Sequence, residues 1–268
     1  MSAVSDYPLT RDAAEHGRLQ QQAEFWAGDA ALLFAQAGVR AGDRVADLGC
    51  GTLHIATQLA SRVGREGVVR ALDSDAALVR ALRAGVAAPV AVECGDAYAT
   101  GWPSASLDAV HARFLAAPAG RADALIGEML RLLRPGGLVL LQEPAADSWT
   151  LPGAGAAWPR LLALIRAGFR CRGGDFDAGA TIAERLRRAG ARGIRRRTVA
   201  HRIGTSHPYA RLPLAFCRSL TALWHEQGLA APAELRELTA AIAAACDDPR
   251  GTTTTFTLVQ AWGRRAAA

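Results

Sequence analysis

Three aspartates that follow short apolar runs are the residues of this sequence with the clearest chemical meaning. Asp47 stands near the end of the first run, directly before a turn that contains Gly49 and Gly51. Asp73 ends the second run and Asp96 follows the third. A glycine turn lets backbone N–H groups approach a ligand closely, and an acid beside it repels a pyrophosphate but suits an amine or a hydroxyl. The three acids therefore predict one pocket for a ligand with an amine and hydroxyls, at the carboxyl edge of a parallel sheet.

The elements that carry these acids follow from the hydrophobic pattern. Short apolar runs alternate with amphipathic segments of helical period, which predicts βαβ units, a parallel sheet and an α/β fold class. We expect strands at 44–48, 68–72, 90–94, 107–112, 138–142, 194–203 and 252–262. We expect helices at 12–37, 53–63, 75–84, 120–133, 158–169, 180–189, 208–228 and 232–246.

Composition narrows the class of protein. Half of the 268 residues are hydrophobic, which is ample for a globular core, and all 31 basic residues are arginine. The net charge of +6 permits an anionic partner, but the arginines are scattered except for the run at 192–197. We interpret that run as the solvated face of a strand, with a nucleic-acid or phosphate contact as the alternative.

Cysteine usage and the N-terminus predict where the protein is found. The five cysteines are widely spaced and form no Cys-x-x-Cys pair, so we expect neither a disulfide framework nor a zinc site. Residues 1–10 lack the basic and apolar regions of a signal peptide. No apolar run approaches the length of a membrane span. We therefore expect a soluble, cytoplasmic protein that does not bind a membrane.

Four motifs in order carry a family resemblance: Asp-Leu-Gly-Cys-Gly-Thr at 47–52, Leu-Asp-Ser-Asp at 72–75, Cys-Gly-Asp-Ala at 94–97 and Leu-Arg-Pro-Gly-Gly at 133–137. They resemble the class I S-adenosylmethionine-dependent methyltransferases. Within that class they resemble the small-molecule group related to ubiquinone and menaquinone methylation and to bacterial natural-product tailoring. The resemblance extends from about Tyr7 to about Pro144, and more weakly to the end of the chain. At one position the chain departs from the family, because Leu53 stands where a third glycine is usual.

The resemblance implies a Rossmann-like seven-stranded sheet that is mostly parallel, with the last strand antiparallel and a helical cap inserted near the C-terminus. It divides the chain into an N-terminal lid helix with the cofactor-binding core (1–144), a partial cap (145–178), a core helix with strand six (179–204), a helical substrate cap (205–250) and a final core strand with its tail (251–268). In the family the inserted helices cover the active site.

The implied cofactor is S-adenosyl-L-methionine, with S-adenosyl-L-homocysteine as its product and no metal. By the resemblance, Gly49 and Gly51 wrap the methionine portion and Asp47 faces its ammonium. Asp73 accepts from both ribose hydroxyls, and Ser74 follows it in the cofactor pocket.

At the adenine end the resemblance assigns two further contacts. Asp96 accepts from the adenine amino group, and the backbone N–H of Ala97 binds a ring nitrogen. Tyr7, in the segment that resembles the family's N-terminal lid, stacks on the cofactor or hydrogen-bonds to it. The alternative for each acid is a helix cap or a turn, since aspartate is favoured there. For Asp75 we prefer that structural role.

Candidates for catalysis lie at the ends of strands 107–112 and 138–142. His111 is a candidate base near neutral pH, and equally a candidate partner of the backbone or of the cofactor carboxylate. Arg113 would pair with that carboxylate, with an acidic substrate or with an internal acid. Glu143 would orient a substrate amine or hydroxyl, or act as a base. A methyltransferase also works without a base, because positioning alone can supply roughly 7–11 kcal/mol of the barrier.

These observations predict methyl transfer from S-adenosylmethionine to a small molecule, in particular an aromatic or polyketide-like natural product. One alternative is a cyclase-type protein of the same fold that binds the cofactor without transferring its methyl group. A nucleic-acid methyltransferase is less favoured, because His-Ala-Arg-Phe (111–114) replaces the Asn-Pro-Pro-aromatic motif of amine methylation. A nicotinamide dehydrogenase is disfavoured, because Asp47 precedes a two-glycine turn.

The expected partner is a small-molecule substrate, and we expect neither nucleic acid nor a membrane as partner. The sequence leaves the oligomeric state open, and a homodimer is one possibility.

Overall fold

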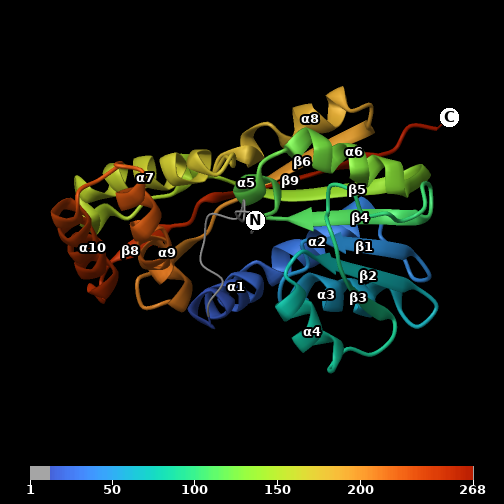
Figure 1. The fold of residues 1–268 in the computed structure, drawn as a ribbon, viewed down its shortest axis with the longest axis horizontal. Helices are drawn as coiled ribbons and strands as arrows, with labels where there is room; N and C mark the ends of the chain where they lie inside the picture. The colour runs from blue at the N-terminus through green and yellow to red at the C-terminus, as the bar shows by residue number, and fades with distance from the viewer. Residues whose placement is uncertain (1–12, 268) are drawn as a thin grey trace.

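Seven strands form one sheet in the computed structural model, which describes residues 13–267. Their order across the sheet is β3-β2-β1-β4-β5-β9-β6, read from bottom to top in Figure 1. The strands are β1 (Arg44–Leu48), β2 (Val68–Asp73), β3 (Val90–Cys94), β4 (Leu107–Arg113), β5 (Leu133–Ala145), β6 (Arg192–Val199) and β9 (Thr257–Arg264). β1 to β5 pair in parallel, whereas β9 is antiparallel to both of its neighbours. This arrangement confirms the predicted α/β fold with a Rossmann-like, mostly parallel sheet and an antiparallel last strand.

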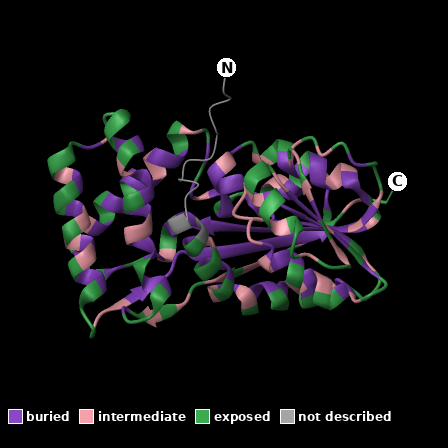
Figure 2. Ribbon diagram, turned by 60° about the horizontal axis from the view of Figure 1, so that its bottom comes forward, coloured by how far each residue is buried: buried purple, intermediate pink, exposed green. Residues whose placement is uncertain are grey.

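Helices cover both faces of the sheet (Figure 1). One face carries α2 (Ala27–Ala37), α3 (His54–Val63) and α4 (Ala76–Arg83), and the other carries α5 (Ala116–Ala119), α6 (Ala122–Leu132) and α8 (Ile182–Arg188). Along β5, Leu138 and Leu140 pack with the first set, whereas Val139 and Leu141 pack with the second. This alternation follows from the two-residue period of a strand. It leaves the strands buried at the centre of the sheet region (Figure 2).

A group of helices lies beyond the carboxyl ends of the parallel strands, at the left of Figure 1. It contains α7 (Ala157–Cys171), α9 (Leu212–Glu226) and α10 (Pro232–Asp247), and α1 (Ala13–Phe25) contacts it from the side of the sheet. Two short strands, β7 (Arg202–Gly204) and β8 (Thr252–Thr254), pair antiparallel in a separate sheet. Short 3-10 helices join these elements: η1 (Ala146–Ser148), η2 (Pro152–Ala154), η3 (Ala178–Ala180) and η4 (Pro208–Arg211). This helical group has an aromatic core of its own, which includes Trp149, Trp158 and Trp224.

The helix expected at 12–37 is divided at Trp26 into α1 and α2. The buried indole of Trp26 reaches into the helical group, where its Nε1 donates to Tyr209 Oη at 2.8 Å. The predicted helix 120–133 also ends early, at Leu132, because the next residue already pairs with the first residue of β4.

The strands expected at 194–203 and 252–262 are divided at the same level of the molecule. There Thr255 N donates to His201 O at 2.9 Å, and His201 N donates to Thr255 Oγ1 at 3.0 Å. These two hydrogen bonds hold the segment that follows β6 against the segment that precedes β9. Next to them, β7 and β8 pair with each other outside the large sheet.

The helices are short relative to a lipid bilayer. The longest in the described part of the chain, α10, has 16 residues, and a membrane-spanning helix needs about 20. Within residues 13–267, no helix combines the length and the apolar composition that crossing a membrane requires.

Candidate functional site

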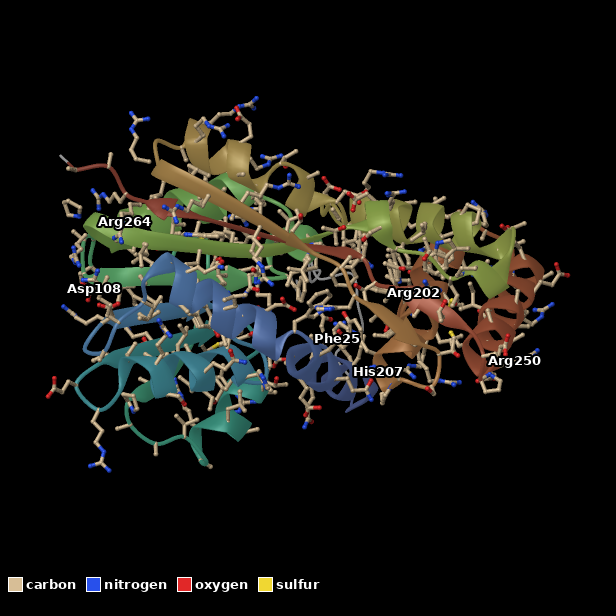
Figure 3. All side chains as sticks on the ribbon, turned by 180° about the vertical axis from the view of Figure 1, so that it is seen from behind. Phe25, Asp108, Arg202, His207, Arg250 and Arg264 are labelled. Atoms are coloured by element: carbon tan, nitrogen blue, oxygen red, sulfur yellow. The ribbon has the colours of Figure 1, made fainter. Side chains whose placement is uncertain are left out.

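A cavity of about 630 Å³ lies at the carboxyl ends of β1 to β4, where the sheet meets the helical group. The loops after β1, β2 and β3 line one end, and α1, α7, α9 and neighbouring loops line the other. Asp47, Asp73 and Asp96, the three acids singled out from the sequence, all line this cavity. Figure 3 labels two residues at this level of the molecule, Phe25 and His207, which lie together between the sheet and the helical group.

A glycine turn after β1 forms part of the cavity wall. Gly49 and Gly51 have φ values of 72° and 47°, in the left-handed region that glycine adopts without a side-chain penalty. Leu53 is left-handed as well, with φ 65°. A leucine in this conformation costs about 1–2 kcal/mol, but its side chain is only 7% exposed and packs in the core with α3. The chain thus has the backbone that a third glycine would favour, and burial of leucine offsets the strain.

Asp73 is held by two backbone groups at the edge of the cavity. Its Oδ2 accepts from Gly51 N at 2.9 Å, and its Oδ1 accepts from Asp75 N at 3.0 Å. Each oxygen has a second lone pair, so the carboxylate can accept two further hydrogen bonds. Asp75 instead accepts from Ala77 N and Leu78 N at the start of α4. The structural role of Asp75 is therefore confirmed, and the cofactor role of Asp73 stays a prediction.

The loops after β2 and β3 contribute neighbouring parts of the cavity wall. Ser74 and Asp96 are exposed, and Ala97 is half-buried between them and the protein interior. Asp96 Oδ1 accepts from Tyr98 N at 2.8 Å, a local turn bond typical of aspartate. The assigned contacts of Asp96 and Ala97 with adenine, and of Ser74 with the cofactor, stay predictions.

Within residues 13–267, two charged groups at the cavity have buried atoms without hydrogen-bond partners. Asp47, which is 2% exposed, binds His111 Nδ1 through Oδ1, but its Oδ2 has no hydrogen-bond partner within residues 13–267. Arg113 Nη1 also lacks a partner in the described part of the chain, so no internal ion pair is found there. Burial lowers the pKa of Arg113 to about 10, and the charge of Asp47 opposes this shift. Because unpaired buried polar atoms are costly, this pair indicates a ligand with one cationic and one anionic group.

His111, a candidate base and cofactor contact, lies inside the protein rather than at the cavity wall. Its side chain is fully buried and is not among those that line the cavity. Its Nδ1 binds Asp47 Oδ1 at 2.9 Å, and its Nε2 binds the side-chain amide of Gln142 at 2.8 Å. Both ring nitrogens already have partners, so this geometry does not fit a substrate base or a direct cofactor contact. The cause is the strand register, which sets His111 directly opposite Asp47.

Glu143, the second candidate base, also differs from the expectation that it lies at the rim of the pocket. It is fully buried on the face of β5 turned toward α5. Its carboxylate accepts from Leu115 N, Ala116 N and Ala117 N at 3.0, 2.8 and 3.0 Å. Burial raises the pKa of Glu143 to about 7, and the three backbone hydrogen bonds oppose this shift. Glu143 therefore anchors the loop between β4 and α5, part of which lines the cavity.

The other end of the cavity is lined by aromatic rings. The phenylalanines come from separate segments and are Phe114, Phe169, Phe176, Phe216 and Phe256. They pack edge to face, with ring centroids 5.2 Å apart for Phe169 and Phe176 and 5.9 Å apart for Phe176 and Phe256. The sequence shows that this region is rich in aromatic residues, but no local pattern distinguishes a ring at the cavity from one that only packs helices together.

Helix α1 closes one side of the cavity. Glu15, Arg18 and Gln22 line it, and Arg18 donates to Glu15 at 2.7 and 2.8 Å and also to Gln22. Arg18 Cζ lies 5.9 Å from the ring centroid of Phe216 across the cavity wall. Tyr7, which is expected to contact the cofactor from the same N-terminal segment, lies outside the described residues.

Sequence reasoning missed Gln142 and Gln260, which contact each other deep in the sheet. Gln142 directly follows the apolar run 138–141, and Gln260 lies between Val259 and Ala261. A glutamine inside an apolar strand is a usable signal, because buried polar side chains need hydrogen-bond partners.

Part of the chain matches a known family, and two curated proteins are similar to it. Residues 45–137 match the protein family described as a methyltransferase domain. The chain is 36% identical over 111 residues to the ubiquinone/menaquinone biosynthesis C-methyltransferase of Chromobacterium violaceum, an alignment that covers 40% of this chain and 45% of that one. It is 32% identical over 189 residues to the nocamycin O-methyltransferase of Saccharothrix syringae, covering 62% of this chain and 65% of that one. The chain thus spans less than half of the first relative and about two thirds of the second.

Solved structures share the fold. A protein of Bacillus halodurans C-125 named as a methyltransferase has a TM-score of 0.60 at 16% identity, covering 90% of this chain and 100% of that one. The phosphoethanolamine N-methyltransferase 2 of Haemonchus contortus, in complex with phosphomonomethylethanolamine and S-adenosylhomocysteine, has a TM-score of 0.55 at 16% identity, covering 90% and 53%. The cyclase SpnF has a TM-score of 0.51 at 20% identity, covering 89% and 80%. The chain thus has the Rossmann-like methyltransferase fold, and its residues 45–137 match a methyltransferase domain.

Proposed function

We propose that this protein transfers the methyl group of S-adenosylmethionine to a small apolar substrate, an aromatic or polyketide-like natural product. The observation that carries the proposal is one cavity with two unlike ends, a charged end at Asp47, Asp73 and Arg113 and an end lined by phenylalanines. A cofactor with an amino-acid group and hydroxyls suits the first end, and a flat apolar substrate suits the second.

The residues of the charged end fit the cofactor group by group. Asp47 Oδ2 and Arg113 Nη1, unpartnered within the described residues, match the ammonium and the carboxylate of its amino-acid portion. Asp73, with one open lone pair on each oxygen, matches the two ribose hydroxyls. Asp96 and Ala97 would hold adenine. The other proposed contacts are Gly49, Gly51 and Ser74. When bound, the cofactor supplies an electrophilic methyl group on a sulfonium.

The chain's own residues would act by orienting the substrate and excluding water. The helical group and α1 would form the substrate cap, and the phenylalanine rings would hold a flat molecule against the cofactor end. Because His111 and Glu143 are buried away from the cavity, we assign neither of them as a base. Alignment of the acceptor atom with the methyl group can by itself supply roughly 7–11 kcal/mol.

The relatives support this substrate class. One is named for methyl transfer to carbon and the other for methyl transfer to oxygen, the second on nocamycin. The cyclase SpnF shares the fold, so the second candidate function is cyclisation of a bound substrate without methyl transfer.

Two measurements test the proposal in order. Calorimetric titration should show that S-adenosylmethionine and S-adenosylhomocysteine bind, and absence of binding by both would contradict the cofactor assignment. Incubation with methyl-labelled S-adenosylmethionine and a panel of phenols, quinols and polyketides should then give a product that carries one labelled methyl group. A converted substrate of unchanged mass would favour the cyclase instead.

A further inference from the structure

A row of polar side chains crosses the sheet beneath α2, one from each of five neighbouring strands. Its members are Asp47 in β1, His111 in β4, Gln142 in β5, Gln260 in β9 and Arg197 in β6. The register sets Asp47 opposite His111, Gln142 opposite Gln260, and Gln260 opposite Arg197. All except Arg197, at the edge of the sheet, are buried. A buried polar row is costly unless its members are hydrogen-bonded. Every member of this row has a hydrogen-bond partner, but one atom, Asp47 Oδ2, has none among residues 13–267.

The row begins at the sheet edge with two charged groups. Arg197 Nη1 donates to Gln260 Oε1 at 2.9 Å, and Arg197 Nη2 donates to Asp29 Oδ1 at 2.7 Å. Asp29, in α2, also binds His201 Nε2 at 2.8 Å. Gln260 Nε2 donates to the backbone oxygen of Asp29 at 3.0 Å and to Gln142 Oε1 at 2.8 Å.

The direction of donation follows from these two charged residues. A guanidinium has only donors, so Gln260 must present Oε1 to Arg197. A backbone oxygen only accepts, so Gln260 must present Nε2 to Asp29, and the two requirements agree. Gln260 Nε2 therefore donates to Gln142 Oε1, which turns the Gln142 amide nitrogen toward His111.

The histidine at the end of the row is thereby restricted to one form. Gln142 Nε2 donates to His111 Nε2, so this nitrogen must be the acceptor and the ring hydrogen must be on Nδ1. The Nδ1–H donates to Asp47 Oδ1 at 2.9 Å. In the other tautomer, the N–H at His111 Nε2 would face the N–H of Gln142, and the lone pair at His111 Nδ1 would face the carboxylate oxygen of Asp47. Asp47 is thus held in one orientation, with an Oδ2 that has no partner among residues 13–267.

We propose that His111, Gln142 and Gln260 are positioning residues, and that Arg197 and Asp29 set the direction of this row so that Asp47 presents Oδ2 to a cationic group in the cavity. The identity of that group, the ammonium of the cofactor, rests on the proposed function. The inference gives His111 a role other than the base expected from the sequence. It also gives a role to Arg197, which the sequence pattern placed on a solvated face.

The first test is the tautomer of His111 in the wild-type protein. Nitrogen-15 NMR of a histidine-labelled sample, assigned with His111→Asn, should show a protonated Nδ1 and an unprotonated Nε2 for this ring. A protonated Nε2 in the wild-type spectrum would overturn the inference, and this measurement needs no ligand and no activity.

The second test reverses one donor with Gln142→Glu. The new carboxylate only accepts, so the ring hydrogen of His111 should move from Nδ1 to Nε2, and Asp47 should lose the Nδ1–H that orients it. Affinity for S-adenosylhomocysteine should fall on the order of tenfold, the effect of a weakened hydrogen bond to a charged group. Affinity for 5′-methylthioadenosine, which lacks the amino-acid portion, should stay unchanged. Gln36→Glu, at an exposed position of α2, is the matched control and should alter neither affinity.

The outcomes separate the two proposals. If the wild-type protein binds neither cofactor form, the proposed function fails while the wild-type spectrum still decides the tautomer. If it binds both, and Gln142→Glu leaves the His111 nitrogen shifts and the S-adenosylhomocysteine affinity unchanged, the positioning role is wrong. If Gln142→Glu does not fold, the same two measurements are made on Gln260→Met. The expected result for that variant is a mixture of His111 tautomers.

Discussion

The charged end and the phenylalanine-lined end of the cavity are built in different ways. At the charged end each acid is oriented by directional hydrogen bonds: Asp73 by Gly51 N and Asp75 N, Asp96 by Tyr98 N, and Asp47 by His111 Nδ1. At the other end the rings come from segments far apart in the chain and hold one another by edge-to-face packing. Directional hydrogen bonds select a ligand atom by atom, whereas packed rings select only its shape and apolar character.

This difference implies that the two ends can be altered separately. A substitution among the rings should affect folding and substrate binding but not cofactor affinity, and a substitution among the charged groups should do the reverse.

Phe176→Ala, at the apolar end, should lower the free energy of unfolding by about 3–5 kcal/mol, as truncation of a buried aromatic side chain does. The ring is 2% exposed and contacts the rings of Trp149, Phe169 and Phe216. Urea denaturation measures the loss, and Leu32→Ala, at an exposed position, is the control. The affinity of the folded variant for S-adenosylhomocysteine should change less than about twofold, since the sites are independent. A larger loss would mean that the two ends are coupled.

Glu143, which anchors the loop between β4 and α5, should make stability depend on pH. Its pKa is raised from 4.5 to about 7 by burial, so the folded state binds this proton more tightly than the unfolded state. The corresponding stability is fully present below about pH 4.5 and is lost as the pH rises through about 7, an effect of about 3 kcal/mol. Glu143→Gln cannot titrate, so the wild-type unfolding free energy should fall relative to that of the variant over this range. A constant difference, measured by urea denaturation at both ends of the range, would contradict the assignment.

Asp73→Asn should weaken binding of S-adenosylhomocysteine and of 5′-methylthioadenosine alike, by about 1.5–3 kcal/mol, because both ligands carry the ribose and lose hydrogen bonds to a charged acceptor. Asp75→Asn is the matched control two residues away. Asparagine is as good a helix cap as aspartate, so calorimetry should show little change in that variant. Equal effects at the two positions would argue against a ribose contact.

Arg113→Met should weaken binding of S-adenosylhomocysteine by about 1.5 kcal/mol, the lower end of the range for one hydrogen bond between charged groups, here with the ligand's carboxylate. Binding of 5′-methylthioadenosine should be unaffected, because it has no carboxylate. The free energy of unfolding without ligand should not fall, since the substitution removes a buried guanidinium atom that has no partner among the described residues. Loss of affinity for both ligands would instead place Arg113 at the nucleoside.

Much of the fold was predictable because its signals are local. β1 and β3 have the bounds expected from the hydrophobic pattern, and the cap formed by Asp75 follows from bonds to residues two and three positions away. The errors occur where distant segments meet. At the break between α1 and α2, Trp26 donates to Tyr209, far along the chain, and no period in the sequence of the two helices reveals the break.

The sequence by itself determined the alternation of strands and helices, the glycine turn and the presence of an acid at or just beyond the end of each of three strands, because each depends on backbone chemistry within a few residues. Only the tertiary structure decided that His111 and Glu143 point away from the cavity and that Gln142 and Gln260 join His111 in one row. Those outcomes depend on which residues stand opposite each other in neighbouring strands. A shift of register by a single residue would turn each of these side chains to the other face of the sheet.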